Sequence, residues 1–215
     1  MKHREWIAGQ RYSMNNAYFE AFHNYTSKSL DIHIHSHDFF ETLLFVKGDV
    51  NFCVEDKIYQ MHPGDILLTN SRELHKASVK GGNIYERYVV WFHPDFVEQI
   101  SEFTGINAAK SFSSSIEKHD NLIRPDSYQF EKMVSKIREL PLNNETAMNP
   151  VTPIHRLTAA QILIMMNELY NSDSSHSAAD VISNPKINDI VLYINHNLSD
   201  DLSLDTLSKK FHISK

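Results

Sequence analysis

Short runs of β-branched and aromatic residues, separated by turn residues, fill the chain from Ala17 to about Phe92. The runs read AYFEAFHNY, LDIHIH, FETLLFVK, VNFCVE, KIYQM, DILLT, HKASV and IYERYVVWF, and the turns between them include Pro63-Gly64 and Gly81-Gly82-Asn83. Strands this short and this regularly spaced are typical of a sandwich or a barrel. No helical pattern interrupts them, which argues against a parallel βαβ sheet.

The hydrophobic period changes at Pro94, where helices are predicted to begin. PDFVEQISEF has a proline at a plausible first helical position, and Gly105 ends this helix. Residues 106–120 are polar and predict a loop. A second helix is predicted from about Ser127 to Pro141, with Asp126 as its cap. It carries one apolar stripe of Phe130, Met133, Val134, Ile137 and Leu140.

A third helix is predicted from about Pro153 to Tyr170, and it has two apolar stripes. The stronger consists of Ala159, Ile162, Leu163, Met166, Leu169 and Tyr170, and the other of Ile154, Leu157, Ile164 and Met165. A helix that is apolar on two sides must bury both. One side can pack on the β domain, and the other on the preceding helix or on a second copy of the chain. The candidate dimer contacts are Ile154, Leu157, Ile162, Leu163, Met166 and Leu169.

The sequence after Asn171 predicts a polar linker and then two short helices. NSDSSHSAAD has the low hydrophobicity of a linker. One amphipathic helix is expected from about Pro185. The next begins at Ser203, which is a good N-cap, and Leu204, Leu207 and Phe211 are expected to form its buried face. A turn at residues 212–214 follows, so the pattern is that of a helix-turn-helix without its second helix.

Composition and charge narrow the class of protein. The 215 residues are 41% hydrophobic and 22% charged, which suits one generous domain or a domain with a smaller partner. The net charge of 21 − 27 = −6 is unlike a free-standing nucleic-acid binder. The single cysteine, Cys53, excludes an internal disulfide and favours a reducing compartment. Neither a signal peptide nor a membrane span is expected, so the predicted location is the cytoplasm.

The stretch HSHDFFETLLFVKG, residues 35–48, carries the clearest chemistry. On one extended strand, His35, His37 and Glu41 would face the same side. In a closed barrel, His75 from a neighbouring strand can reach the same interior. Such a set can bind Zn, Mn, Fe or Ni, or it can hydrogen-bond a small ligand without any metal. A third interpretation is that these residues only hydrogen-bond one another.

The spacing of these residues resembles the first cupin motif. His-x-His, three residues, Glu, six residues and Gly matches His35, His37, Glu41 and Gly48. The second cupin motif is partly present, because Gly64-Asp65 and His75 are kept while Asn70-Ser71 stands where the family has a proline. The resemblance implies a mainly β N-terminal cupin, a double-stranded β-helix or jelly-roll barrel, followed by α-helices, and so an α+β chain overall.

For the strand ending at Phe92, the sequence does not decide which of two alternating sets of residues faces inward. Tyr85, Arg87, Val89 and Trp91 share one parity, and Glu86, Tyr88, Val90 and Phe92 share the other. With the first set inside, Arg87 would suit a polar or anionic ligand and Trp91 would stack on a sugar face. Arg87 and Trp91 therefore join His35, His37, Glu41 and His75 as candidate effector-binding residues.

The chain from about residue 17 to residue 215 resembles AraC-type transcription regulators. HIHSHDFFETLLFVKGDVNF is similar to the start of their sensor barrel, and KINDIVLYINHNLSDDLSLDTLSKKFHIS to the opening of their DNA-binding domain. The resemblance implies an arm (1–16), a cupin-like barrel (17–125), a helical dimerisation segment (126–171), a linker (172–184) and an incomplete helix-turn-helix domain (185–215). Candidate residues of that last domain are Ser203, Lys209, Lys210, Ser214 and Lys215.

Two functions follow from this organisation. The first is a homodimeric transcription regulator that binds a small effector, with a sugar among the candidates, requires no cofactor, and binds DNA only in a full-length protein. The second is a metal-dependent cupin enzyme, an oxygenase or isomerase, or a metal-sensing cupin, using His35, His37, Glu41 and His75. A helix-turn-helix opening after a linker favours the regulator, since an enzyme has no use for it.

Overall fold

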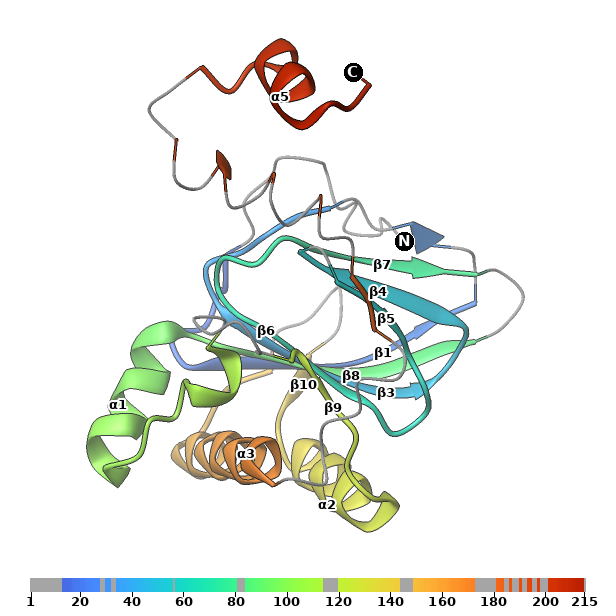
Figure 1. Ribbon diagram of the computed structural model, residues 1–215. Coiled ribbons are helices and arrows are strands. Elements are labelled where there is room, and N and C mark those ends of the chain that lie inside the picture. The colour runs from blue at the N-terminus through green and yellow to red at the C-terminus, as the bar shows by residue number, and fades with distance from the viewer. Residues whose placement is uncertain are drawn as a thin grey trace.

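Two β-sheets form the N-terminal part of the protein, and helices cover one of them (Figure 1). The computed structural model describes residues 13–27, 30–31, 34–55, 57–80, 84–113, 120–143, 149–172, 181–183, 186, 190, 193–194, 197 and 201–214. Lys215, most of the predicted arm and most of the helix expected near Pro185 lie outside these residues.

The first sheet has six strands in the order β10-β1-β8-β3-β6-β9. Its strands are β1 (Phe19–Thr26), β3 (Phe40–Lys47), β6 (Ile66–Thr69), β8 (Tyr85–Phe92), β9 (Leu122–Ile123) and β10 (Leu142–Asn143). All neighbours are antiparallel except β1 and β10, which are parallel. The central strands are long and rich in Phe, Tyr, Val and Leu, as expected of strands that are buried on both faces.

The second sheet has five strands in the order β11-β5-β4-β7-β2. These are β2 (Leu30–Asp31), β4 (Val50–Val54), β5 (Lys57–Gln60), β7 (His75–Val79) and β11 (Val181–Ser183). The chain crosses from the first sheet to the second at Gly48, whose φ of +147° suits glycine. A Cβ at Gly48 would lie 3.3 Å from the Cα of Tyr85, so the two backbones meet closely there.

Alternation along β8 divides the hydrophobic core into two layers. Tyr85, Val89 and Trp91 belong to the layer between the two sheets, which also holds Phe39, Phe45, Phe52 and Tyr59. Tyr88, Val90 and Phe92 belong to the layer between the first sheet and the helices. The sequence left open which of the two sets of alternate residues on this strand faces inward. The structure shows that the set containing Arg87 and Trp91 faces the interior of the barrel.

Helices α1 (Pro94–Thr104) and α3 (Pro153–Asn171) begin and end within one residue of the prediction. Helix α2 (Ser127–Arg138) begins at the predicted residue and ends shortly before the predicted stop at Pro141. Gly105, with φ of +72°, caps the end of α1, and Asp126 forms a capping box with Gln129 at the start of α2. α2 and α3 lie side by side against the six-stranded sheet (Figure 1). A short 3₁₀ helix, η1 (Lys110–Phe112), lies within the predicted 106–120 loop.

Two short strands lie in segments for which the sequence predicted no strand. The segment predicted as a linker, 172–184, contains β11, which pairs antiparallel with β5. The segment predicted as helical, 126–171, contains β10, which extends the barrel sheet beside β1. Its helices share their core with that sheet, as expected for one side of the third helix. Both errors have one cause: pairing between strands far apart in sequence leaves no local pattern in so short a strand.

Most of the predicted dimer contacts lie in the core of a single chain. Ile162, Leu163, Met166 and Leu169 are buried between α3 and the first sheet, so they cannot contact a second copy. Ile154 and Leu157, in contrast, are 63% and 64% exposed. The stronger stripe is therefore the one that packs on the β domain, and the most exposed residues of the weaker stripe are Ile154 and Leu157 at its start.

The C-terminal helix α5 (Leu204–Phe211) begins at Ser203, whose Oγ accepts a hydrogen bond from the amide of Thr206 at 3.3 Å. Leu207 is buried, as predicted. Leu204 is 72% exposed, so its placement on the buried face is wrong. Tyr193 packs against Phe211 with ring centroids 5.5 Å apart, which joins α5 to the preceding helical residues. No helix in the described part of the chain is long and apolar enough to cross a membrane.

Candidate functional site

Three buried side chains converge inside the barrel: His37, Glu41 and His75. One nitrogen or oxygen atom from each lies within 4.8 Å of the others. Glu41 is on β3 and His75 begins β7, so the group joins the two sheets. The prediction of one continuous strand from His35 to Lys47 is wrong, because the chain bends at residues 38–39 and β3 begins at Phe40. The side chains of His37 and His75 still lie close to Glu41. The backbone of His35 pairs with that of His75, so the segment before the bend runs beside β7.

Hydrogen bonds to the backbone fix the tautomer of both histidines. His37 Nδ1 lies 2.8 Å from the carbonyl oxygen of Phe39, and His75 Nδ1 lies 2.9 Å from that of Glu73. A carbonyl oxygen only accepts, so each Nδ1 carries the hydrogen and each Nε2 presents a lone pair. Among the described residues, neither buried Nε2 atom has a hydrogen-bond partner. Two unsatisfied acceptors therefore point into the site.

Burial keeps these imidazoles neutral. It lowers the pKa of His37 to about 2, helped by the neighbouring His75 and His35, and it lowers the pKa of His75 to about 4. Burial also raises the pKa of Glu41, although the hydrogen bond from Trp91 opposes that change. Trp91 Nε1 donates to Glu41 Oε2 at 2.6 Å, and the same oxygen lies 3.8 Å from His37 Nε2. One carboxylate and two neutral imidazoles thus face a common point.

Aromatic rings hold this group in place. The rings of His37 and Phe39 stack with centroids 3.8 Å apart, and Phe39 lies 4.5 Å from Trp91. Phe22 also packs against Trp91, with centroids 4.7 Å apart. His35 lies beside the group, its ring 4.4 Å from that of His75 and 6.2 Å from that of His37. The structure therefore brings His37, Glu41, His75 and Trp91 together, with His35 at their edge.

Arg87 lies on the same strand as Trp91, nearer its start. It precedes Trp91 by four residues on β8, which corresponds to about 13 Å along a strand. Its guanidinium donates to Thr26 Oγ1 at 2.9 Å and lies 4.1 Å above the ring of Tyr85. Burial lowers the pKa of Arg87, while Tyr85 and Glu41 raise it. Arg87 therefore offers a buried cation that interacts electrostatically with Glu41, while its hydrogen bonds go to Thr26 and Tyr85.

The three convergent acceptors define what can bind. A partner must supply a Lewis acid or hydrogen-bond donors, because the described side chains around the two Nε2 atoms supply neither. Two neutral imidazoles and a carboxylate suit a borderline divalent metal such as zinc. Hydroxyl or amino groups of a small organic molecule would satisfy the same atoms. The residues present thus fit either kind of occupant.

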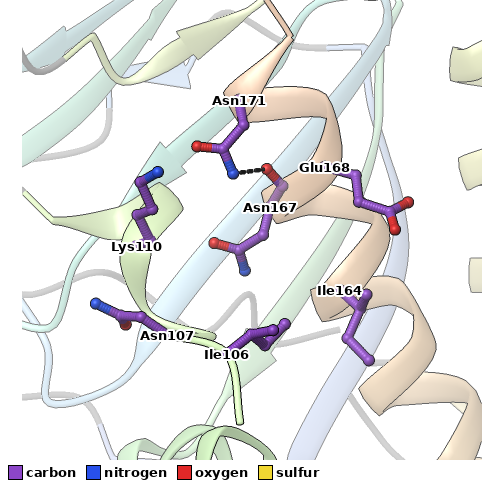
Figure 2. A pocket seen from close by; sticks show the side chains of 7 residues that line it. All are labelled: Ile106, Asn107, Lys110, Ile164, Asn167, Glu168 and Asn171. Atoms are coloured by element: carbon purple, nitrogen blue, oxygen red, sulfur yellow. Dashed lines mark hydrogen bonds between the residues drawn. The ribbon is translucent and has the colours of Figure 1, made fainter. Parts of the chain in front are cut away.

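A surface hollow of about 330 Å³ lies elsewhere, between α3 and the chain that precedes η1 (Figure 2). Its lining residues are Ile106, Asn107, Lys110, Ile164, Asn167, Glu168 and Asn171. Asn167 accepts from the amide of Ser111 and donates to the carbonyl oxygens of Ala108 and Leu163. The Asn167 side chain thus holds the segment around η1 against α3, and we assign this hollow a structural rather than a ligand-binding role.

Comparison with known proteins agrees with the geometry of the barrel. Residues 18–136 match the family described as the AraC-like ligand binding domain. This chain belongs to that family. The family prediction made from HIHSHDFFETLLFVKGDVNF is confirmed, and so is the mainly β N-terminal domain followed by helices.

Individual relatives of this AraC-like domain are distant. It is 29% identical over 83 residues to the uncharacterized HTH-type transcriptional regulator YbfI of Bacillus subtilis, which is 38% of this chain and 30% of the relative's length. A structure of ToxT from Vibrio cholerae aligns with 92% of this chain and 72% of its own, at 10% identity and a TM-score of 0.43. A cupin from Methanocaldococcus jannaschii aligns with 40% of this chain and 80% of its own, at 18% identity and a TM-score of 0.35.

Three residues near the site of this AraC-like domain were missed by sequence reasoning. Thr69 pairs with Glu41 across β6 and β3, so both side chains lie on one face, and its buried Oγ1 has no hydrogen-bond partner among the described residues. Glu73 supplies the carbonyl that fixes His75, and Asn121 donates to the Glu73 carboxylate at 3.0 Å. The alternation of residues in DILLT could have predicted that Thr69 faces inward. No local sequence pattern predicts that Asn121 is buried near the site.

The candidate DNA-binding residues occupy the end of the described chain. Lys209 and Lys210 are exposed on the last turn of α5, and the Lys210 ammonium lies 4.2 Å above the ring of Tyr193. Ser203 caps the helix, and Ser214 is exposed beyond it. Ser203 is thus the predicted N-cap of α5, and the role of these residues in DNA binding stays a prediction.

Proposed function

We propose that this chain is the sensor part of a ligand-responsive transcription regulator and that its effector contacts His37, Glu41 and His75. The observation that supports the site is the pair of buried Nε2 atoms without partners. Leaving such atoms unsatisfied costs roughly 1–3 kcal/mol each, so an occupant that satisfies them is bound selectively by the folded chain. The family supports a sensing role over catalysis.

The preferred effector class is a small molecule with hydroxyl or amino groups, sugars included. Such groups donate to the imidazoles and to the carboxylate. The predicted stacking of Trp91 on a sugar is not part of this proposal, because Phe39 and Phe22 pack against the Trp91 ring. Arg87, further along β8, would bind an anionic group at the other end of a longer effector. One related structure, ToxT, is described as bound to (E)-4-(8-methylnaphthalen-1-yl)but-3-enoic acid, which fits a small-molecule effector.

A divalent metal is the second candidate occupant. It is favoured by the same tautomers, because Nε2 lone pairs with Nδ1 fixed by a backbone carbonyl are the usual arrangement of metal-binding histidines. Metal occupancy would make the chain a metal sensor, or a cupin enzyme if substrate also reached the ion. Metal analysis of untagged protein distinguishes this candidate from a metal-free effector site.

Thermal unfolding of the chelator-treated chain, with a panel of sugars, polyols, amines and Zn²⁺, tests the site. An occupant at 100 times its Kd should stabilise the chain by about 2.7 kcal/mol, which corresponds to a rise in Tm of roughly 5–10 °C for a protein of this size. Organic effectors should act with chelator present, and Zn²⁺ only without it. If every compound stabilises a His37→Ala variant as well as the parent, the site lies elsewhere.

We also propose that two copies associate through the start of α3. Ile154 and Leu157 lie three residues apart on one helix face and are both exposed, so they form an apolar pair that no described part of the chain covers. Sedimentation equilibrium should show a dimer for the parent and a shift of at least about tenfold toward monomer for Leu157→Glu, roughly 1.4 kcal/mol. The matched control is Tyr128→Glu, which is exposed on α2. An unchanged equilibrium in Leu157→Glu would contradict this interface.

A further inference from the structure

Strand β11 connects the sensor to the C-terminal helix, because it lies between the end of α3 at Asn171 and the start of α5 at Leu204. It pairs with β5 in the register Val181 with Tyr59, Ile182 with Ile58 and Ser183 with Lys57. Without β11, β5 would be the edge of the five-stranded sheet. An edge strand presents unpaired amides and carbonyls that bind an added strand. The edge of the sensor sheet is thus a docking surface for the chain's own connecting segment.

Buried hydrogen bonds lead from this edge to the proposed effector site. Tyr59 of β5 donates its hydroxyl to Asn121 Oδ1 at 3.2 Å, and the Asn121 amide nitrogen of the backbone donates back to that hydroxyl at 3.3 Å. Asn121 Nδ2 donates to the Glu73 carboxylate at 3.0 Å. The carbonyl of Glu73 accepts from His75 Nδ1 at 2.9 Å. Each of the four side chains is at least nine-tenths buried.

This series of hydrogen bonds connects strand β5 directly to the proposed effector site. His75 lies at the site end of the chain of hydrogen bonds, and its Nε2 is the atom that an occupant would engage. Tyr59 lies at the other end, and its backbone is the partner of Val181. A three-residue ladder is short, so its hydrogen bonds only narrowly outweigh the entropy lost when the segment is ordered. A modest change in the order of β5 is therefore enough to shift it.

We propose that β11 is a strap whose pairing with β5 is strengthened when the effector site is occupied, through His75, Glu73, Asn121 and Tyr59. This proposal rests on the proposed function in one respect, namely that the occupant engages His75. Occupancy fixes the His75 ring, and with it the Glu73 carbonyl, the Asn121 side chain and β5. The strap then holds the C-terminal helix closer to the sensor, which is how occupancy reaches the DNA-binding end.

Hydrogen–deuterium exchange of residues 57–60 and 181–183 in the whole chain tests this. Tyr59→Phe keeps the ring and removes only the hydroxyl, and Tyr25→Phe, at an exposed position on β1, is the matched control. In unliganded protein, Tyr59→Phe should speed exchange at 181–183 about fivefold, and Tyr25→Phe should leave it unchanged. Equal exchange in the two variants overturns the strap.

Zn²⁺ serves as the probe of occupancy, with its binding measured separately by calorimetry. In the parent chain, Zn²⁺ should slow exchange at 181–183 about fivefold, and Tyr59→Phe should bind Zn²⁺ but lose this effect. Binding without any slowing in the parent overturns the strap while leaving the site intact. Absence of Zn²⁺ binding contradicts the metal candidate, and the unliganded comparison then decides for or against the strap.

The coupling between strap pairing and site occupancy can also be measured in the opposite direction, as an effect of the strap on binding. If occupancy strengthens the strap, loss of the strap must weaken occupancy by the same factor. Ile182→Pro removes an amide hydrogen from β11 and prevents regular pairing, whereas Ile182→Val preserves the strand. In a chain that binds Zn²⁺, Ile182→Pro should weaken Zn²⁺ binding about fivefold relative to Ile182→Val. Identical affinities in these two variants contradict the coupling.

Discussion

Replacing His75 by alanine is expected to remove most of the stabilisation that an occupant gives the sensor. The substitution deletes one of the two Nε2 atoms that face the site, and with it either a metal ligand or a buried hydrogen-bond acceptor. We expect affinity to fall at least about 100-fold, roughly 2.7 kcal/mol. At a concentration that is 100 times the parent's Kd, stabilisation would then drop from about 2.7 to about 0.4 kcal/mol.

Calorimetric titration of parent and variant with the same stabilising compound measures this difference. His62→Ala is the matched control, because the His62 side chain is half exposed beside the turn at Pro63-Gly64, away from the interior. Circular dichroism before titration shows that His75→Ala is folded. Parent-like affinity in His75→Ala, with loss in His62→Ala, would place the binding site outside the barrel.

Replacing Asn121 by alanine is expected to cause the largest loss of stability among the polar positions described. Asn121 donates to the carbonyl of Leu68 and the carboxylate of Glu73, and it accepts from Tyr59. All these partners are buried, so alanine leaves several polar groups unsatisfied at once. We expect a loss on the order of 3 kcal/mol, which lowers Tm by roughly 6–12 °C.

Asn107→Ala is the control for this prediction, since Asn107 is exposed and its side chain accepts a hydrogen bond from the nearby amide of Ala109. Its loss should stay within about 1 kcal/mol. Asn121→Asp should be at least as destabilising as alanine, because it places a second carboxylate beside Glu73. Urea unfolding curves give all three values. Equal losses for Asn121→Ala and Asn107→Ala would show that the buried network contributes little.

Much of the fold was readable from the sequence because its signals are local. Proline and aspartate at helix starts and glycine at a helix end act within a few residues, so the bounds of α1, α2 and α3 could be predicted. Alternation along IYERYVVWF showed that two sets of side chains face opposite ways. It could not show that both faces are covered, since that depends on helices later in the chain.

The features that were missed all depend on distant pairing. The apolar stripes of α3 required burial, but the sequence did not say that the stripe of Ile162 and Met166 would meet the chain's own sheet. For the site, spacing identified His37, Glu41 and His75. The unsatisfied Nε2 atoms follow from carbonyl groups of Phe39 and Glu73, and backbone carbonyls have no signature in a sequence.

A single strand, β8, lies between the barrel interior and the helices, and its alternate side chains face the two layers. Trp91 holds the carboxylate of Glu41 on the inner side, while the neighbouring outward residues Val90 and Phe92 support α2 and α3. Tyr88, on the same outer side, accepts a hydrogen bond from Arg138 of α2 at 2.9 Å. If β8 shifts when a molecule binds beside Trp91, the surface that packs against α2 and α3 shifts with it.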